Sequence, residues 1–230
     1  MSREYQPGPP HYETGDPFTD GYVLTTLGKT QTGKTSFGRE LHAESPRFSV
    51  WLNATGKDRV DDVPGTTVRS VEGVAEAMRQ NEWAVEFVSD DRRRDVVALQ
   101  DLLWSVAENT NRQFPMQVVF DEVQEIAPQS NKAEFPPRDA VRRLAKRGVK
   151  RGIKTVPITQ DPTEFDKQTL RQSEYRVFFP MTRESRQASV ISKMGIDWDA
   201  VESGDRYTGA LFDDTGRLLS DSVKAEARYA

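Results

Sequence analysis

The chain has 230 residues, of which 36% are hydrophobic, 30% charged and 9% aromatic, and its formal net charge is -4. This length and composition fit one globular domain that buries a sizeable core without disulfides or a structural metal. The absence of cysteine excludes a disulfide framework, a thiolate zinc site and a cysteine nucleophile, and two histidines are too few for a protein-built metal cage. No apolar run approaches the roughly 20 residues of a bilayer span, so we expect a soluble, cytoplasmic protein without stable membrane insertion.

The predicted elements alternate between strands and helices after residues 1–20, a Pro- and Gly-rich segment expected to be a flexible arm. In chain order they are strand 22–27, helix 35–43, strand 47–52, helix 71–80, strand 83–88, helix 94–109, strand 117–120, a helix from Pro136 to about Arg147 that stops at Gly148, strand 153–159, helix 162–172, strand 175–179, helix 184–194, and a hairpin of 206–212 and 217–219. The alternation predicts one α/β domain over 21–222, with a mainly parallel sheet, helices on both faces and a C-terminal β-hairpin, followed by a tail, 223–230.

A phosphate-binding motif lies between the first predicted strand and the first predicted helix. Its residues are Gly28, Lys29, Thr30, Gln31, Thr32, Gly33, Lys34 and Thr35. They fit the pattern GxxxxGK[ST], in which the glycines let successive N–H groups face a β-phosphate and the helix N-terminus adds its positive end. Lys34 is expected to reach the β- and γ-phosphates, and Thr35 to ligate Mg²⁺. The motif therefore predicts a nucleoside triphosphate site.

Two adjacent acids, Asp121 and Glu122, follow the apolar strand 117–120. At the carboxyl end of the sheet, Asp121 could hold the Mg²⁺ shell and Glu122 could orient and activate a water. The alternative is that both are solvated loop charges or caps of the following turn. The extra strand 83–88 lies in the chain between the phosphate loop and Asp121, which is typical of the additional-strand, glutamate-using branch of P-loop ATPases.

An amide, Gln160, ends the strand 153–159. It could hydrogen-bond a γ-phosphate oxygen or the attacking water, although chemistry alone favours a helix cap or a loop amide. Pro157 is awkward in that strand, because a central strand needs the N–H that proline lacks.

These three motifs, in this order, resemble the FtsK/HerA superfamily of ATP-driven DNA pumps. The residues that carry the resemblance are the phosphate loop from Gly28 to Thr35, the pair Asp121 and Glu122, and Thr159 and Gln160 followed by Pro162. The resemblance implies a RecA-like P-loop fold with ATP and Mg²⁺ as cofactors. It also implies a Glu122 that activates water, a Gln160 that senses the γ-phosphate, and a ring of five or six subunits with ATP between neighbours.

The superfamily implies an arginine that reaches a neighbour's nucleotide. Its usual place, three residues before the glycine that opens the sensor strand, is occupied here by Val149. A guanidinium is needed to neutralise charge on the transferred phosphoryl group, so we expect Arg147 or Arg151 to act in trans, with Arg143 third.

A basic segment stands out in this acidic chain, since residues 138–154 carry a net +7. Its helix places Arg142, Arg143, Lys146 and Lys150 away from an apolar stripe. Four interpretations stay open: a solvated helix face, a contact between subunits, a trans-acting arginine, or a non-specific contact with the phosphate backbone of double-stranded DNA.

The short chain favours one branch of the superfamily, because other branches carry membrane segments or an added β-barrel. We expect an ATPase that pumps double-stranded DNA into a preformed viral particle, with a capsid-vertex or procapsid protein as partner and a location in the host cytoplasm or at the packaging vertex. The alternatives are a cellular or plasmid HerA/VirD4-like pump, a P-loop nucleotide or nucleoside kinase, and a non-catalytic, nucleotide-switched adaptor.

Overall fold

The computed structural model describes residues 21–53, 63–110, 114–129, 135–204 and 207–224. Over these ranges the strands are β1 (Leu24–Leu27), β2 (Phe48–Asn53), β3 (Thr66–Val68), β4 (Ala84–Val88), β5 (Met116–Phe120), β6 (Ile153–Thr159), β7 (Tyr175–Phe178), β8 (Thr208–Asp213) and β9 (Leu218–Lys224). They form one sheet in the order β3-β4-β2-β5-β6-β1-β7-β8-β9. The pairs from β3 to β7 are parallel, and β8 and β9 add an antiparallel hairpin, so the predicted fold class is confirmed.

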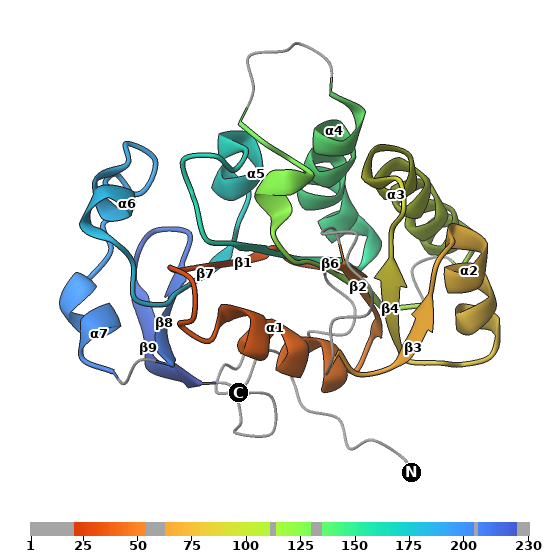
Figure 1. The fold of residues 1–230 in the computed structure, drawn as a ribbon, viewed down its shortest axis with the longest axis horizontal. Coiled ribbons are helices and arrows are strands. Elements are labelled where there is room, and N and C mark those ends of the chain that lie inside the picture. The colour runs from red at the N-terminus through yellow and green to blue at the C-terminus, as the bar shows by residue number, and fades with distance from the viewer. Residues whose placement is uncertain (1–20, 54–62, 111–113, 130–134, 205–206, 225–230) are drawn as a thin grey trace.

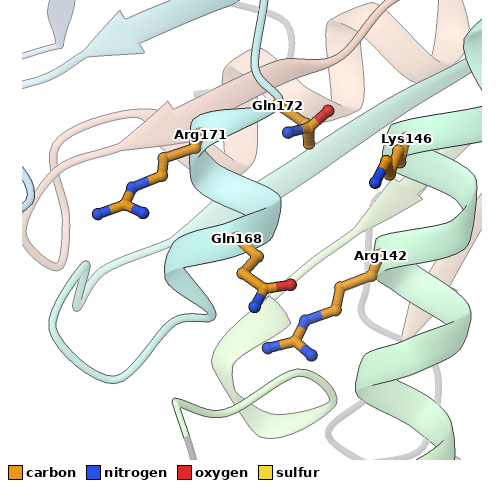
Figure 2. Close-up of a pocket in the computed structure, with 5 residues that line it drawn as sticks. All are labelled: Arg142, Lys146, Gln168, Arg171 and Gln172. Carbon is orange, nitrogen blue, oxygen red and sulfur yellow. The ribbon is translucent and has the colours of Figure 1, made fainter.

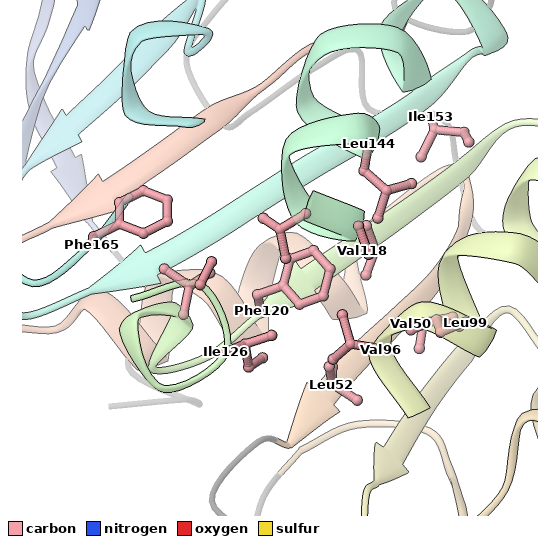
Figure 3. Close-up of a cluster of buried hydrophobic side chains, with 14 of the residues drawn as sticks. Val50, Leu52, Val96, Leu99, Val118, Phe120, Ile126, Leu144, Ile153 and Phe165 are labelled. Carbon is pink, nitrogen blue, oxygen red and sulfur yellow. The ribbon is translucent and has the colours of Figure 1, made fainter. Parts of the chain in front are cut away.

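Helices cover both faces of this sheet (Figure 1). They are α1 (Lys34–Ala43), α2 (Val71–Arg79), α3 (Arg92–Asn109), α4 (Pro136–Arg143), α5 (Lys167–Arg171), α6 (Arg183–Gln187) and α7 (Trp198–Glu202), with short turns η1 (Val123–Glu125), η2 (Leu144–Gly148) and η3 (Val149–Arg151). Helix α1 packs on one face through Phe37 and Leu41. Helices α2 to α5 pack on the other, where Val96, Leu99 and Leu144 meet side chains of β2 and β5 (Figure 3).

The order of the strands brings three loops to one edge of the sheet. Strand β6 lies between β1 and β5, with Leu27 beside Thr159 and Phe120 beside Pro157. Because these strands are parallel, the residues that follow them meet at their shared carboxyl end. In the sheet, β6 is the strand that lies between β1, which precedes the phosphate loop, and β5, which precedes Asp121. The extra strand noted from chain order, β4, lies on the far side of β2 instead.

Pro157 sits in this central strand at a local break in pairing. The ladder between β1 and β6 shows a bridge at Val23 and Thr155 and resumes at Thr26 and Ile158, without a pairing at Pro157. The missing N–H of proline accounts for the break, and β5 still pairs along the other side of β6.

Several predicted boundaries were wrong. The helix expected to stop at Gly148 continues as the π-helical turn η2 and the 3₁₀ turn η3 as far as Gly152, whose φ of 71° suits glycine. The helices expected at 162–172 and 184–194 shrink to α5 and α6, because turns occupy the rest of each range. Strand β9 runs to Lys224, beyond the domain end expected at residue 222. The arm expected at 1–20 and the tail from 225 lie outside the described residues.

Candidate nucleotide-binding site

The phosphate loop connects the end of β1 to the start of α1. Gly28 has a φ of 159°, and a Cβ there would lie 2.6 Å from Cβ of Phe179, so only glycine fits. Gly33, with a φ of 99°, precedes α1, whose first turn has no side-chain cap. The N–H groups at this helix start are thus left for an anionic ligand.

Lys34 points back into this loop. Its Nζ donates to the main-chain oxygen of Lys29 at 2.7 Å, and the side chain is buried. Burial lowers the pKa of Lys34, while the charges of Glu122 and Asp121 oppose that shift. The lysine and both acids therefore share one electrostatic environment, as the motif analysis predicted.

Asp121 follows β5 at the same edge of the sheet as the phosphate loop. Desolvation and the neighbouring charge of Glu122 raise the pKa of Asp121 to about 6, against the opposing effects of the Glu122 main-chain N–H, Arg39 and Lys34. An acid that is costly to ionise without a partner is suited to a cation. The sequence analysis did not predict Arg39, which lies in the second turn of α1, because no sequence pattern indicates that a residue of this helix lies near Asp121.

Glu122 has an unusual backbone and a fully occupied carboxylate. Its φ of 51° and ψ of 48° lie in the left-handed region, which turns the chain sharply after β5. Gln160 Nε2 donates to both of its carboxylate oxygens, at 2.9 and 2.8 Å, and Gln124 Nε2 donates to Oε2. Main-chain strain of this kind is concentrated at functional sites.

Hydrogen bonds extend from these two amides to the phosphate loop and to the end of β6. Gln160 Oε1 accepts from the Thr30 hydroxyl of the phosphate loop at 2.5 Å, and Gln124 Oε1 accepts from the Thr159 hydroxyl at 2.8 Å. Gln160 is therefore neither a helix cap nor a solvated loop amide, since it joins Glu122 to the phosphate loop. Gln124 was missed because it lies two residues past the acid pair, in the turn η1, and no pattern marks it.

This chain resembles known proteins in structure but not in sequence. No family model matches the chain, and no curated protein matches its sequence. Among solved structures, the genome packaging NTPase B204 from Sulfolobus turreted icosahedral virus 2, in complex with ATP-gammaS, superimposes with a TM-score of 0.62 over 90% of this chain and 97% of that chain, at 15% identity. VirB4 of Thermoanaerobacter pseudethanolicus gives a TM-score of 0.62 over 94% of this chain and 93% of that chain, at 11% identity.

The chain has a RecA-like P-loop fold. Both likenesses extend over nearly the whole of each chain, so the fold implied by the FtsK/HerA resemblance is confirmed. This P-loop fold accounts for the shared edge at which Lys34, Asp121, Glu122 and Gln160 meet.

The residues of this P-loop site fit a magnesium ion that arrives with a nucleotide. Among the described residues no group of three or more His, Asp or Glu could hold a metal by itself. Asp121 and the half-buried Thr35 supply only two oxygen ligands, and Mg²⁺ typically takes its remaining ligands from phosphates and waters. Burial and the charge of Glu122 raise the pKa of Asp121, and a cation bound beside it would favour the charged carboxylate and oppose that shift.

The structure does not bring the expected arginines to this site. The main-chain oxygen of Val149, between Arg147 and Arg151, accepts from Gly21 N at 3.1 Å, before β1 begins. Both arginines therefore lie near the amino ends of the strands, at the edge opposite the phosphate loop. Arg151 contacts its own chain, with its guanidinium 3.7 Å from the Trp104 ring centroid and 3.0 Å from Glu108.

The other basic residues also separate into two kinds. Arg142 pairs with the buried Asp166, and Arg143 lies over the Trp104 ring at 4.3 Å. Arg147 is exposed and makes no hydrogen bond or ion pair with any residue that the structure describes.

No helix in the described ranges is long and apolar enough to cross a membrane.

Proposed function

We propose that the chain is an ATPase that moves double-stranded DNA, and that its cargo is a viral genome pumped into a preformed capsid. The observation that carries the ATPase step is the convergence of Lys34, Asp121, Glu122 and Gln160 at one sheet edge. The fold shared with a genome packaging NTPase supports the DNA-moving step.

Each side chain of the site has a defined role in this proposal. Lys34 would neutralise the β- and γ-phosphates, and the bare N-terminus of α1 would receive them. Bound Mg²⁺, held by Thr35 and Asp121, would supply charge neutralisation between the phosphates. Glu122 would take a proton from a water molecule while the oxygen of that water bonds to the γ-phosphorus. The bond between the γ-phosphorus and the oxygen that bridges it to the β-phosphate would break, releasing ADP and phosphate.

Gln160 links this chemistry to the phosphate loop. Its amide already contacts Glu122 and Thr30, so a γ-phosphate that attracts the amide would change both contacts at once. Movement of the loop after β6 would then report the state of the nucleotide to the rest of the subunit.

A ring of five or six subunits is part of the proposal. An arginine from a neighbour would complete the site, and Arg147 is the better candidate because Arg151 is held by Trp104 and Glu108 of its own chain. A capsid-vertex protein would hold such a ring in place during packaging.

The deciding experiment measures steady-state ATP hydrolysis with and without long duplex DNA over a series of salt concentrations. Stimulation that fades as salt rises supports a DNA motor, because contacts with phosphates release counterions. Hydrolysis that DNA does not change would contradict the motor, and stimulation by a small nucleoside would favour a kinase instead.

A further inference from the structure

The cations of the basic segment 138–154 divide into those that the fold uses internally and those that it leaves exposed. The first group is held by a carboxylate, an aromatic ring or burial in the core: Arg138, Arg142, Arg143, Arg151 and Lys154. The second group, Lys146, Arg147 and Lys150, is exposed and forms no ion pair or side-chain hydrogen bond with any described residue. The net charge of the segment therefore acts outward through these three side chains.

One of these exposed cations borders a hollow between two helical elements. A cavity of about 290 Å³ is lined by Arg142, Lys146, Gln168, Arg171 and Gln172. Figure 2 shows Arg142 and Lys146 on one wall, and Gln168 and Arg171 of α5, with Gln172 just after it, on the other. Each lining side chain ends in N–H donors, and no carboxylate is among the described residues that line the hollow.

Arg142 forms a fixed part of this hollow. Its Nε and Nη2 donate to the two carboxylate oxygens of Asp166 at 2.9 and 2.5 Å, and Asp166 also accepts from Thr169. Asp166 and the nearby Asp139 balance the charge of Arg142. The uncompensated charge of the hollow therefore comes from Lys146 and Arg171, which are exposed and unpaired among the described residues.

We propose that this hollow binds the phosphodiester backbone of duplex DNA, with Lys146 and Arg171 as the charged contacts and Gln168 and Gln172 as neutral donors. The proposal rests on the proposed function and adds to it the place where DNA binds and the number of phosphates, two, that the hollow neutralises. Lysine, arginine and glutamine donors to phosphate oxygens position DNA without reading its sequence, which suits a motor that works on any sequence.

A phosphate backbone fits the hollow better than an acidic protein surface does. A surface that binds protein carboxylates typically uses arginines, which bind them bidentately, whereas two of the donors here are neutral glutamine amides. Both amides and both unpaired cations are exposed, so a ligand can reach them from solvent. The hollow lies between α4 with η2 on one side and α5 with Gln172 on the other, and none of Lys34, Asp121, Glu122 and Gln160 lines it, so DNA and ATP could bind together.

The test compares two double variants in binding to a long random duplex over about 50 to 200 mM salt. Lys146→Ala with Arg171→Ala removes the charges of the hollow. Arg183→Ala with Lys193→Ala removes one exposed arginine and one exposed lysine from the region after β7, and is the matched control. The slope of log K against log salt is negative, and we expect only the first variant to make it less steep, by about 2, because each neutralised phosphate contributes about 0.9.

Affinity near 100 mM salt should fall by about ten- to a hundredfold in the first variant, while ATP hydrolysis without DNA stays unchanged. The charge-keeping variant Lys146→Arg with Arg171→Lys should retain the wild-type slope. If wild type binds DNA and both Ala doubles keep its slope, the hollow is not a DNA contact and the proposed function still stands. If wild type binds no duplex, both proposals fail. If the first variant loses its oligomeric mass instead of its DNA affinity, the hollow binds an acidic surface of a second copy and the proposal is overturned.

Discussion

The side-chain amide of Gln160 spans both carboxylate oxygens of Glu122, at 2.9 and 2.8 Å. Because Gln160 also accepts from Thr30, a single amide joins the phosphate loop to the acid that is expected to activate water. In this arrangement the amide competes with water for the carboxylate oxygens. A nucleotide that draws Gln160 toward its γ-phosphate would free Glu122 for chemistry, and under the proposed function nucleotide binding and activation of the base would then be coupled.

Replacing Glu122 with glutamine tests the role of the base. The isosteric amide keeps the shape of the site but cannot accept a proton from water, so we expect ATP affinity to persist while turnover falls by about a hundredfold to ten-thousandfold. Equilibrium binding of an ATP analogue and phosphate release under multiple turnover measure the two effects. Glu125→Gln is the control, since Glu125 is exposed and pairs with Arg92; normal turnover in Glu122→Gln would remove the assigned role.

The substitution Lys34→Met tests the phosphate loop. The methionine keeps the apolar stem and removes the amine, so we expect nucleotide to lose its stabilising effect on thermal unfolding. Because burial already disfavours the charged amine, the nucleotide-free protein should not lose stability through the lost charge. Lys29→Met is a matched control on the same loop, where the side chain is exposed and only the main chain contacts Lys34. An undiminished thermal shift with ATP in Lys34→Met would contradict the site.

Gln124 is expected to be a positioning residue. Thr159 fixes its amide so that the nitrogen faces Glu122, and Gln124→Leu would leave the acid held by Gln160 alone. We expect kcat to fall by about tenfold with an unchanged KM, because misplacement of a catalytic group costs rate more than binding. Thr159→Val should act through the same contact, so the double variant should lose little beyond Gln124→Leu. Additive losses, or a raised KM alone, would argue against this role.

The motifs predicted which residues meet at this end of the sheet because each motif is local. The phosphate loop carries its own glycine geometry, and an apolar strand followed by Asp121 and Glu122 specifies which end of the sheet holds the acids. The position of β6 between β1 and β5 is not local information, since it depends on how strands that are distant in the chain pair. For the same reason Arg39 was missed, because it joins the site only through tertiary packing, whereas Gln124 lies close in the chain but no pattern marks it.

The basic segment shows the opposite case, in which composition misleads. Eight cations in 138–154 suggested one charged surface. Tertiary contacts instead place Arg142 on Asp166, Arg143 and Arg151 on Trp104, and Lys154 in the core. Side-chain pairing of this kind depends on residues far along the chain, which charge counting along a helix cannot reveal.

Arg142 and Arg147 should respond differently to replacement by alanine. Burial raises the pKa of Asp166, but hydrogen bonds from Arg142 and Thr169 outweigh it and hold this pKa below its ordinary value. This contribution is present above the unfolded pKa of about 3.9 and is lost as pH falls through the lowered folded value. Arg142→Ala should therefore cost about 2 kcal/mol at neutral pH and move acid unfolding to higher pH, because it leaves a buried carboxylate with one partner fewer.

The matched variant Arg147→Ala should leave stability unchanged, since that side chain is exposed and unpaired among the described residues. If Arg147 acts in trans, its loss should lower ATP turnover, and mixing with Glu122→Gln subunits, whose own sites are inactive, should partly restore it. Urea unfolding at several pH values and turnover of the mixtures measure these effects. Equal destabilisation by the two alanines would contradict the separation of structural from exposed arginines.

The buried Lys154 of strand β6 predicts how the stability of the protein depends on pH. Its amine is buried in β6, 4.8 Å from the centroid of the Tyr22 ring, and burial, with a smaller effect of Arg47, lowers its pKa well below the ordinary value. The unfolded chain keeps this amine protonated up to about pH 10.4, so it binds more protons than the folded chain does. The free energy of unfolding should consequently rise with pH between the lowered folded pKa and that value.

Lys154→Met should remove this dependence and raise stability at neutral pH, because an apolar chain of similar length replaces a group that is costly to charge there. The exposed Lys193→Met is the control and should leave the pH profile of unfolding as it is in wild type. Urea unfolding of the three proteins from neutral to alkaline pH gives the measurement. A Lys154→Met variant that is less stable than wild type at neutral pH, or that keeps the wild-type slope, would mean that the amine holds a charge in the folded protein and that the Tyr22 ring stabilises it there.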